Sequence, residues 1–422
     1  MQPEFSLSIP SHGTSKSALL SVSVGASLRR SRPVCICRRL LPSSSLSPGL
    51  RADASRMLIT SAAGLLALLG LPLLLFVFLT NRARRQRIQR RLAQKQLELA
   101  DQQLRIRGRL AGLGISTREA HSAAQTLSAV SLQRRLADGR LTPTGLLYAC
   151  QAQTVHTQDE LALGGLGEFI CEAEKWALEL EARDTRAAPP LFGLPVSLKE
   201  CIPVAGHDSP YGLVGQTGRP HGADCVVTRV LKRQGAVPFA LTAMPPTGLA
   251  MDSCNPVYGR VTNPHSRLHS IPAAFCGIAG LKPTQNRLST KGLGFPGRDS
   301  VFHLKAALGP MARTVDGLVL LMRALLTPDM FRLDRGVVPL PFDEAAFDPP
   351  PSFEARRLTI GYYSSFESEA CVQAVPAVRR CVDMARQALE RRGHRMVQFR
   401  VPSPETAHRL SLLALCPDGG EA

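Results

Sequence analysis

The feature that most constrains this chain is an uncharged run of 23 residues, 57–79, which reads MLITSAAGLLALLGLPLLLFVFL. As a helix it covers about 34 Å, enough to cross the hydrocarbon core of a bilayer. A helix buried in a soluble core is rarely apolar on every face, and Pro72 is tolerated in membrane helices. A signal peptide is the alternative, but its apolar region is usually shorter and precedes a small-residue cleavage site. The run therefore predicts one N-terminal transmembrane helix.

A cluster of basic residues follows the run directly. Because such clusters stay on the cytoplasmic side of a membrane, we expect a single-pass protein whose globular part faces the cytoplasm. The endoplasmic reticulum or another endomembrane is the expected location, and the lipid bilayer is the expected partner, since these side chains also suit anionic headgroups. The cluster consists of Arg82, Arg84, Arg85, Arg87, Arg90, Arg91 and Lys95.

The formal net charge of +18 lies mostly in this N-terminal region. Residues 1–109 contain 18 Lys and Arg against 4 Asp and Glu, whereas residues 110–422 contain 33 against 29. The hypothesis of a nucleic-acid-binding protein would rest on this net charge alone. The basic region lacks the interleaved aromatic residues on which bases stack. We therefore predict no nucleic-acid partner.

Two polar segments flank the predicted span. Residues 1–56 contain 14 Ser and 8 Lys and Arg, a composition typical of a transit peptide or a disordered tail. Residues 80–126 form a basic juxtamembrane segment, in which 86–110 predicts a polar helix. We expect a solvent-exposed linker helix there, with a partner-binding coil as the alternative, because its apolar residues form only a loose stripe: Ile88, Leu92, Leu99, Leu104 and Ile106.

The globular part, 127–422, has the pattern of an α/β domain. Two units each read strand, helix, strand, and each helix ends at a glycine, Gly235 or Gly393. Such alternation predicts parallel strand pairs. The first unit has strands at 194–198 and 237–241 around a helix with apolar positions from 223 to 231. The second has strands at 358–363 and 396–401 around a helix over 378–389. Further helices are predicted over 127–137, 143–156 and 158–186.

Motifs for metal, nucleotide or serine-hydrolase chemistry are absent from the sequence. None of the 11 cysteines has CxxC spacing or a histidine at zinc-ligand spacing. There is no GxSxG or P-loop motif. We predict reduced thiols and neither a metal nor a cofactor.

One short stretch carries a candidate catalytic group. In GLPVSLKE, 193–200, Ser197 and Lys199 alternate with apolar residues, so both lie on one face of the predicted strand. A lysine carried toward a protein interior pairs or lowers its pKa, and a neutral lysine acts as a base. The alternative is that the strand ends there and the ammonium reaches water.

GLPVSLKE belongs to an ordered series of motifs that resembles the amidase signature family and, within it, the membrane-bound fatty acid amide hydrolases. The similarity runs from about residue 127 to 422, and the predicted membrane span matches that subfamily. The other motifs are GHDS at 206–209, CNPVYGRVTNP at 254–264, IPAAFCGIAGLKPT at 271–284, GPMART at 309–314 and DMFRLD at 329–334.

The resemblance implies an α/β fold with a mixed sheet covered by helices, and hydrolysis of fatty acid amides by a Ser–Ser–Lys triad. In that mechanism a lysine deprotonates a bridging serine, which activates a second serine for attack on the amide carbonyl. Backbone N–H groups stabilise the oxyanion. Lys199 falls on the family's lysine. Gly248 falls where the family has a residue that contacts substrate through its backbone, with an ordinary loop glycine as the alternative. The resemblance implies no cofactor, and the sequence carries no signature of oligomeric state.

Both serines of the triad are missing from their expected place. The family's Gly/Ser-rich segment lies between the NP and AAFCG motifs, but here only HSRLHS separates Pro264 from Ile271. We expect an internal deletion at 270/271, as alternative splicing or a gene-prediction error produces. Ser266 and Ser270 remain nearby without a glycine pair, as ordinary loop serines or, for Ser270, a surrogate nucleophile.

The domain is also expected to be truncated at its C-terminus, and hence incomplete. We therefore predict a membrane-anchored serine amidase by resemblance, impaired in this chain. The alternative is a non-catalytic membrane-bound relative that binds lipid or partners.

Overall fold

The computed structural model describes residues 48–113, 124, 126–161, 166–184, 188–248, 253–261, 273, 277–293, 306–347, 356–366, 368 and 371–415. Within 48–71, and at a few later positions, it describes the backbone only. The chain divides into two compact units, Met1–Phe78 and Leu79–Ala422, and each is considered by itself. Residues 1–47 of the predicted tail lie outside the described residues, as do Ser266, Ser270 and the expected junction at 270/271.

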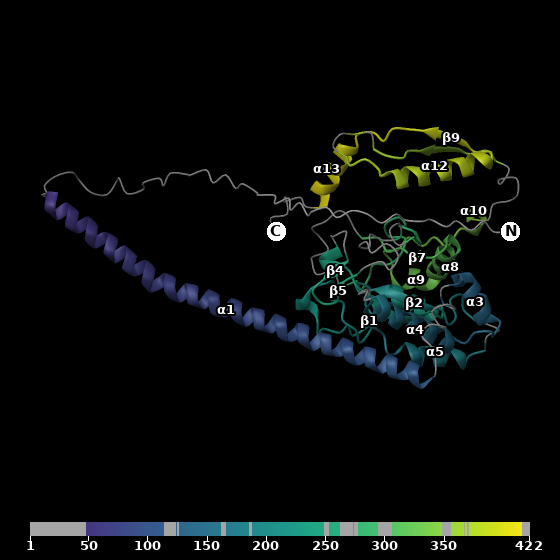
Figure 1. The fold of residues 1–422 in the computed structure, drawn as a ribbon, viewed down its shortest axis with the longest axis horizontal. Coiled ribbons are helices and arrows are strands. Elements are labelled where there is room, and N and C mark those ends of the chain that lie inside the picture. The colour runs from purple at the N-terminus through teal and green to yellow at the C-terminus, as the bar shows by residue number, and fades with distance from the viewer. Residues whose placement is uncertain are drawn as a thin grey trace, which may run out of the picture. The chain divides into compact units, whose positions relative to one another are not determined.

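A single long helix, α1 (Pro48–Gly112), contains the predicted span (Figure 1). Among the described residues, no helix combines the length and hydropathy needed to cross a membrane. The side chains of 57–71, most of the predicted span, lie outside that set.

The part of α1 within the second unit is docked on the domain, so the prediction of a solvent-exposed linker helix over 86–110 is wrong. Ile106 and Leu110 are buried in a small apolar cluster with Ala152, Val155 and Phe169. These partners come from α4 (Pro143–Leu161) and β1 (Leu166–Phe169). Ile106 and Leu110 lie one helical turn apart. A single turn of α1 therefore makes the apolar contact with the domain, without a long apolar stripe along the helix.

The core of the second unit is a three-stranded mixed sheet in the order β1–β3–β2. β2 (Pro195–Lys199) pairs parallel with β3 (Val237–Thr242), and β1 pairs antiparallel with β3. The connection between β2 and β3 contains α6 (Val226–Arg233), so the predicted parallel unit is confirmed. Gly193 enters it and Gly235 closes α6, both at positive φ, +68° and +84°.

Helices pack against this sheet and bury its central strand. Four of the six β3 residues are buried, as two neighbouring pairs on either side of the half-buried Phe239, and burial of neighbouring positions is typical of a strand covered on both faces. The predicted helices over 127–137 and 143–156 are confirmed as α3 (Ala129–Ala137) and α4. α5 (Ala173–Glu181), α8 (Val315–Leu325) and α9 (Pro328–Leu333) complete the core, whose fully buried members include Leu147, Ile170, Val230, Val237, Leu241 and Met330.

The prediction of a helix over 158–186 is wrong in its first half. α4 ends at Leu161, β1 occupies Leu166–Phe169, and only α5 is helical beyond it. β1 is a strand because it pairs with β3 at an edge of the sheet, where Phe169 is fully buried. The sequence LGEF has neither the alternation nor the β-branched residues that indicate a strand.

The second predicted unit is also confirmed. β8 (Thr359–Tyr362) pairs parallel with β9 (Arg395–Gln398), and α12 (Pro376–Arg391) connects them. Gly393 follows α12 at a φ of +88°. The remaining elements are short: η2 (Val214–Gln216), η3 (Pro246–Gly248), β4 (Cys254–Asn255), β5 (Gly259–Arg260), β6 (Ala279–Gly280), β7 (Met311–Ala312), α10 (Glu344–Phe347) and α13 (Pro404–Leu415).

Candidate active site

Lys199 is the last residue of β2, and its side chain is exposed. Ser197 is exposed on the same face, whereas Leu198 between them is buried, so the predicted alternation holds. The strand ends here because the next residues turn: the Ile202 amide donates to the Lys199 carbonyl at 2.8 Å. Among the described residues the Lys199 ammonium therefore faces outward, as the alternative interpretation of this strand predicts.

The residue after Lys199 is buried beneath it. Glu200 is completely inaccessible, and its Oε1 accepts a hydrogen bond from the Met244 amide at 2.9 Å. Burial raises the pKa of Glu200 to about 7, and hydrogen bonds from the Met244 and Gly212 amides oppose that rise only in part. Sequence reasoning missed Glu200, although alternation places it on the opposite face from Lys199 and hence toward the core.

The Met244 peptide is held from both sides. Its amide donates to Glu200, and its carbonyl accepts from Asn255 Nδ2 at 2.7 Å. Asn255 in turn accepts from the Val257 and Tyr258 amides through Oδ1. These contacts fix the start of the loop that leads to Gly248, so Glu200 links the Lys199 strand to the Gly248 loop.

Gly248 ends η3 at a φ of +76° and is exposed. A Cβ added there would lie 2.9 Å from the Met244 methyl carbon Cε. The positive φ favours glycine here, whereas the Met244 methyl group stands at the end of a flexible side chain that can move aside. This is consistent with a backbone contact to a ligand and equally with an ordinary tight turn, so the role of Gly248 stays a prediction, as does that of Lys199.

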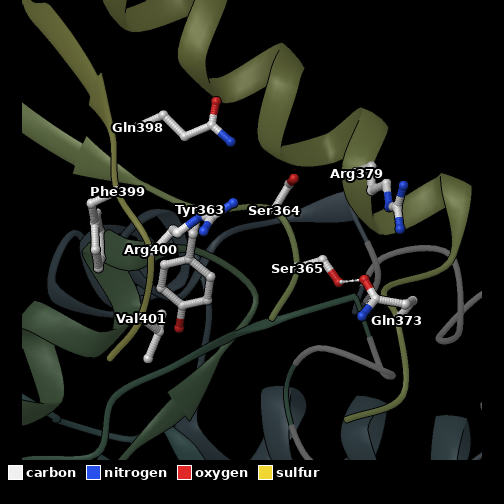
Figure 2. Close-up of a pocket in the computed structure, with 9 residues that line it drawn as sticks. All are labelled: Tyr363, Ser364, Ser365, Gln373, Arg379, Gln398, Phe399, Arg400 and Val401. Carbon is white, nitrogen blue, oxygen red and sulfur yellow. Dashed lines mark hydrogen bonds between the residues drawn. The ribbon is translucent and has the colours of Figure 1, made fainter. Parts of the chain in front are cut away.

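Two hollows among the described residues are considered, and neither is lined by Lys199 or Gly248. The first, of about 190 Å³, lies where β8 and β9 end and includes Arg379, Arg400 and Ser364 (Figure 2). The second, of about 290 Å³, lies between α1 and Tyr258. No group of three or more His, Cys, Asp or Glu side chains within the described ranges is arranged to hold a metal ion.

Comparison with known proteins gives a consistent picture. The family model Amidase matches in two pieces, residues 155–271 and 270–422, which meet at 270 and 271. Fatty-acid amide hydrolase 1 of Sus scrofa is 39% identical over 266 residues, which cover 55% of this chain and 44% of that protein. Vitamin D3 hydroxylase-associated protein of Gallus gallus is 33% identical over 318 residues, covering 68% of this chain and 65% of the relative.

Solved structures give the same fold. A structure of fatty acid amide hydrolase superposes with a TM-score of 0.66 at 22% identity, covering 78% of this chain and 65% of the other. At that identity the likeness concerns the fold, which confirms an α/β domain of this type. The chain spans about half to two thirds of the length of the relatives it matches.

Proposed function

We propose, from the premise that this chain belongs to the Amidase family, that it is a membrane-anchored relative of the fatty acid amide hydrolases that binds fatty acid amides without hydrolysing them. The observation that carries the proposal is the two-piece family match, which joins at 270 and 271. That is where the sequence lacks the Gly/Ser-rich segment with both triad serines. Lys199 is retained, and so is the loop of Gly248, whose start is hydrogen-bonded through the Met244 amide to Glu200, the residue after Lys199.

Loss of the serine segment removes the reaction, because amide hydrolysis needs its parts together. Lys199 supplies a base, but a base without a nucleophile and an oxyanion hole gives nearly none of the rate of the complete unit. Lys199 is exposed at the end of β2. Binding does not need the nucleophile, and Glu200 and Asn255 keep the Gly248 loop in place.

Membrane anchoring rests on the sequence of 57–79 and on the basic cluster that follows it. The arginines of the cluster, from Arg82 to Arg91, are exposed, as contact with anionic headgroups requires. The expectation that Lys95 takes part in this contact is wrong, because Lys95 is buried against Glu168 and Asp208. We propose that the domain faces the cytoplasm at an endomembrane, by the positive-inside rule. After carbonate extraction of membranes the full chain should remain in the pellet, and its recovery in the supernatant would contradict the anchor.

A serine-directed probe tests the chemistry. The 422-residue chain should not react with a fluorophosphonate and should not hydrolyse a fatty acid amide above background. A chimera with the Gly/Ser-rich segment of the porcine relative inserted between Ser270 and Ile271, and with that relative's C-terminal region, should regain labelling. Lys199→Ala in the chimera should then abolish turnover. Stoichiometric labelling of the unmodified chain at Ser266 or Ser270 would replace this proposal with an active amidase.

Binding is tested separately with a radiolabelled long-chain fatty acid amide and the chain in detergent micelles. We expect saturable binding that Gly248→Val weakens by about tenfold, because a β-branched residue at positive φ displaces the loop. Gly139→Val is the matched control, since Gly139 also has a positive φ, +69°, but no neighbour within 4 Å of an added Cβ, and it lies between α3 and α4. Equal binding by both variants would remove Gly248 from the site, and no saturable binding by the parent chain would remove the proposed function.

A further inference from the structure

A buried network of charged side chains joins α1 to the domain. Lys95, on α1, is 4% exposed, and its Nζ lies 2.7 Å from Glu168 Oε2 and 3.1 Å from Asp208 Oδ2. Glu168, on β1, and Asp208, in the loop after β2, are equally buried. Asp208 also accepts from the amides of Gly218 and Arg219. One lysine of the helix is therefore held by two carboxylates from two different parts of the domain.

His207 forms the second cation of this network. Its Nδ1 contacts Glu168 Oε1, and its Nε2 lies 3.0 Å from Glu172 Oε2. A neutral imidazole has one N–H donor and one acceptor, so only the imidazolium donates to both carboxylates. Burial alone would lower the pKa of His207, but the hydrogen bonds and charges of Glu168 and Glu172 outweigh burial and raise it.

The charges around His207 come from every element packed against it. α1 contributes Lys95 and, 3.7 Å from Lys95, Glu98. β1 contributes Glu168, the turn before α5 contributes Glu172, and Asp208 is its chain neighbour. Gln102 of α1 lies 3.5 Å from Glu168, and the buried Glu200 and the half-buried Tyr258 interact electrostatically with Glu168. Three carboxylates contact Lys95 or His207 directly, so the network approaches charge balance only when both Lys95 and His207 are protonated.

Fully buried apolar side chains of α1 lie at one end of this region, whereas Ile88, Leu92 and Leu99, nearer Lys95, are only half-buried. Ile106 and Leu110 are buried, but they lie about three turns beyond Lys95. Between them, a hollow of about 290 Å³ is lined on the helix by Gln96, Leu99, Ala100 and Gln103. Further toward the N-terminus, the exposed Arg91 donates to the Gly215 carbonyl at 2.6 Å. Around Lys95, ionic contacts therefore replace the packing that usually fixes a helix to its domain.

We propose that Lys95, Glu168, Asp208, His207 and Glu172 form a pH-controlled latch, which holds residues 88–103 of α1 on the domain while His207 is protonated and loosens them when it loses its proton. The latch acts on the sheet that carries Lys199. Glu168 pairs with Leu241 of β3, and Leu241 pairs with Leu198 of β2, so the three lie in one row across the sheet. This inference stands whether or not the chain binds a fatty acid amide.

The direction of the pH effect follows from His207. Its folded-state pKa lies above the ordinary value of 6.5, so its contribution is complete below about pH 6.5 and is lost as pH rises through the folded-state pKa. The pKa of Glu168 is lowered, because the hydrogen bond to His207 and the charge of Lys95 outweigh burial. The pKa of Lys95 is raised, because Glu168 and Asp208 outweigh burial. Both groups therefore stay charged over the range in which His207 titrates.

Hydrogen exchange of the full chain in detergent micelles tests the latch, with rates at pH 5.5–8.5 corrected for intrinsic exchange. Amides of 88–103 should exchange at least about tenfold faster at pH 8.5 than at pH 5.5. This is the factor expected for the loss of one charge-assisted hydrogen bond. Amides of 104–112, anchored by Ile106 and Leu110, should change little. A parent chain with no pH step in 88–103 would overturn the proposal.

Variants assign the step to His207. His207→Gln should exchange fast in 88–103 at every pH, whereas His221→Gln, in the same loop region, should keep the parent profile. Glu200→Gln should keep a pH step, because the hydrogen bonds of Glu200 run to the Met244 and Gly212 amides and its interaction with the latch is only an electrostatic one with Glu168. Glu172→Gln removes a half-exposed carboxylate and should move the midpoint down by roughly half to one pH unit, which keeps the test decisive if His207→Gln unfolds. An unchanged pH step in His207→Gln, or an unmoved midpoint in Glu172→Gln, would refute the latch.

Discussion

The two strand–helix–strand units of this chain have the same local sequence pattern and very different burial. In the first, five of the eight residues of α6 are buried, including Val226, Val230 and Leu231. In the second, none of the 16 residues of α12 is buried, and the four residues of β8 alternate only between exposed and half-buried. Both helices connect parallel strands and both end at a glycine of positive φ.

The difference comes from what surrounds each unit. β3 has a neighbouring strand on either side, and α6 packs against α8 and α9 as well as β3. Among the described residues, β8 and β9 form a sheet of two strands, and α12 packs against β9. A two-stranded sheet with one helix has fewer partners against which to bury apolar surface than a three-stranded sheet covered by several helices. Periodicity thus determines the element, whereas burial depends on partners elsewhere in the chain.

The largest contrast is expected at the closing glycines. A Cβ at Gly235 would lie 2.7 Å from Pro189 Cγ and 2.9 Å from Phe192 Cα, whereas a Cβ at Gly393 would meet nothing within 4 Å. Gly235→Ala should therefore lower the free energy of opening by about 3 kcal/mol, from left-handed strain and a backbone clash. Gly393→Ala should cost about 1 kcal/mol, from strain alone. Native-state hydrogen exchange of β3 and β9 amides measures both.

Equal costs at the two glycines would contradict this contrast, because they would mean that the second unit is packed as closely as the first. Gly139→Ala serves as a further control. Gly139 has a φ of +69° and no neighbour within 4 Å of an added Cβ, so it should behave like Gly393.

A matched pair of valines gives the next largest effect. Val230 in α6 is fully buried, and Val382 occupies the corresponding apolar face of α12 but is half-exposed. Val230→Ala should destabilise its unit by about 2 kcal/mol, through lost transfer free energy and a residual cavity. Val382→Ala should cost about 0.5 kcal/mol, because little apolar surface returns to water. If Val382→Ala proved as costly as Val230→Ala, the apolar face of α12 would be covered in solution.

Much of the fold was predictable because it depends on local pattern. The strands around Lys199, α6, α12 and the glycine ends follow from apolar spacing and from turn residues. β1 was not predictable: Glu168 sits in its middle, and a buried glutamate indicates a strand interior only once its partners are known. The docking of α1 was missed for the same reason, since Lys95 reads as a solvated residue until Glu168 and Asp208 are seen beside it.

The candidate site divides in the same way. Lys199 was found from a motif and from strand alternation. Glu200 was missed, because its importance comes from a hydrogen bond to Met244, a residue in a different segment of the chain. Asn255 was quoted only as part of a motif, and its hold on the Met244 carbonyl needs the fold. Groups that act through side chains can be found in a sequence, whereas groups that position a loop act through backbone contacts between distant segments.

The smallest expected contrast concerns a basic residue on each helix. In the last turn of α6, Lys232 Nζ lies 2.8 Å from Asp224 Oδ2 and 3.7 Å from the centre of the Trp176 ring, with both charged side chains largely buried. Lys232→Met should cost about 1–2 kcal/mol, because it removes a desolvated cation–π contact together with an ion pair. Arg386 of α12 pairs with Glu390 at the surface, and Arg386→Met should change opening of β9 by no more than the error of the measurement, since solvent screens such pairs. In 0.5 M NaCl the loss of stability caused by Lys232→Met should stay the same, because that contact is desolvated. Any residual effect of Arg386→Met should disappear, because salt screens exposed charges. A larger loss from Arg386→Met than from Lys232→Met would mean that the charged surface of α12 is desolvated by a neighbour, and the contrast between the two units would fail.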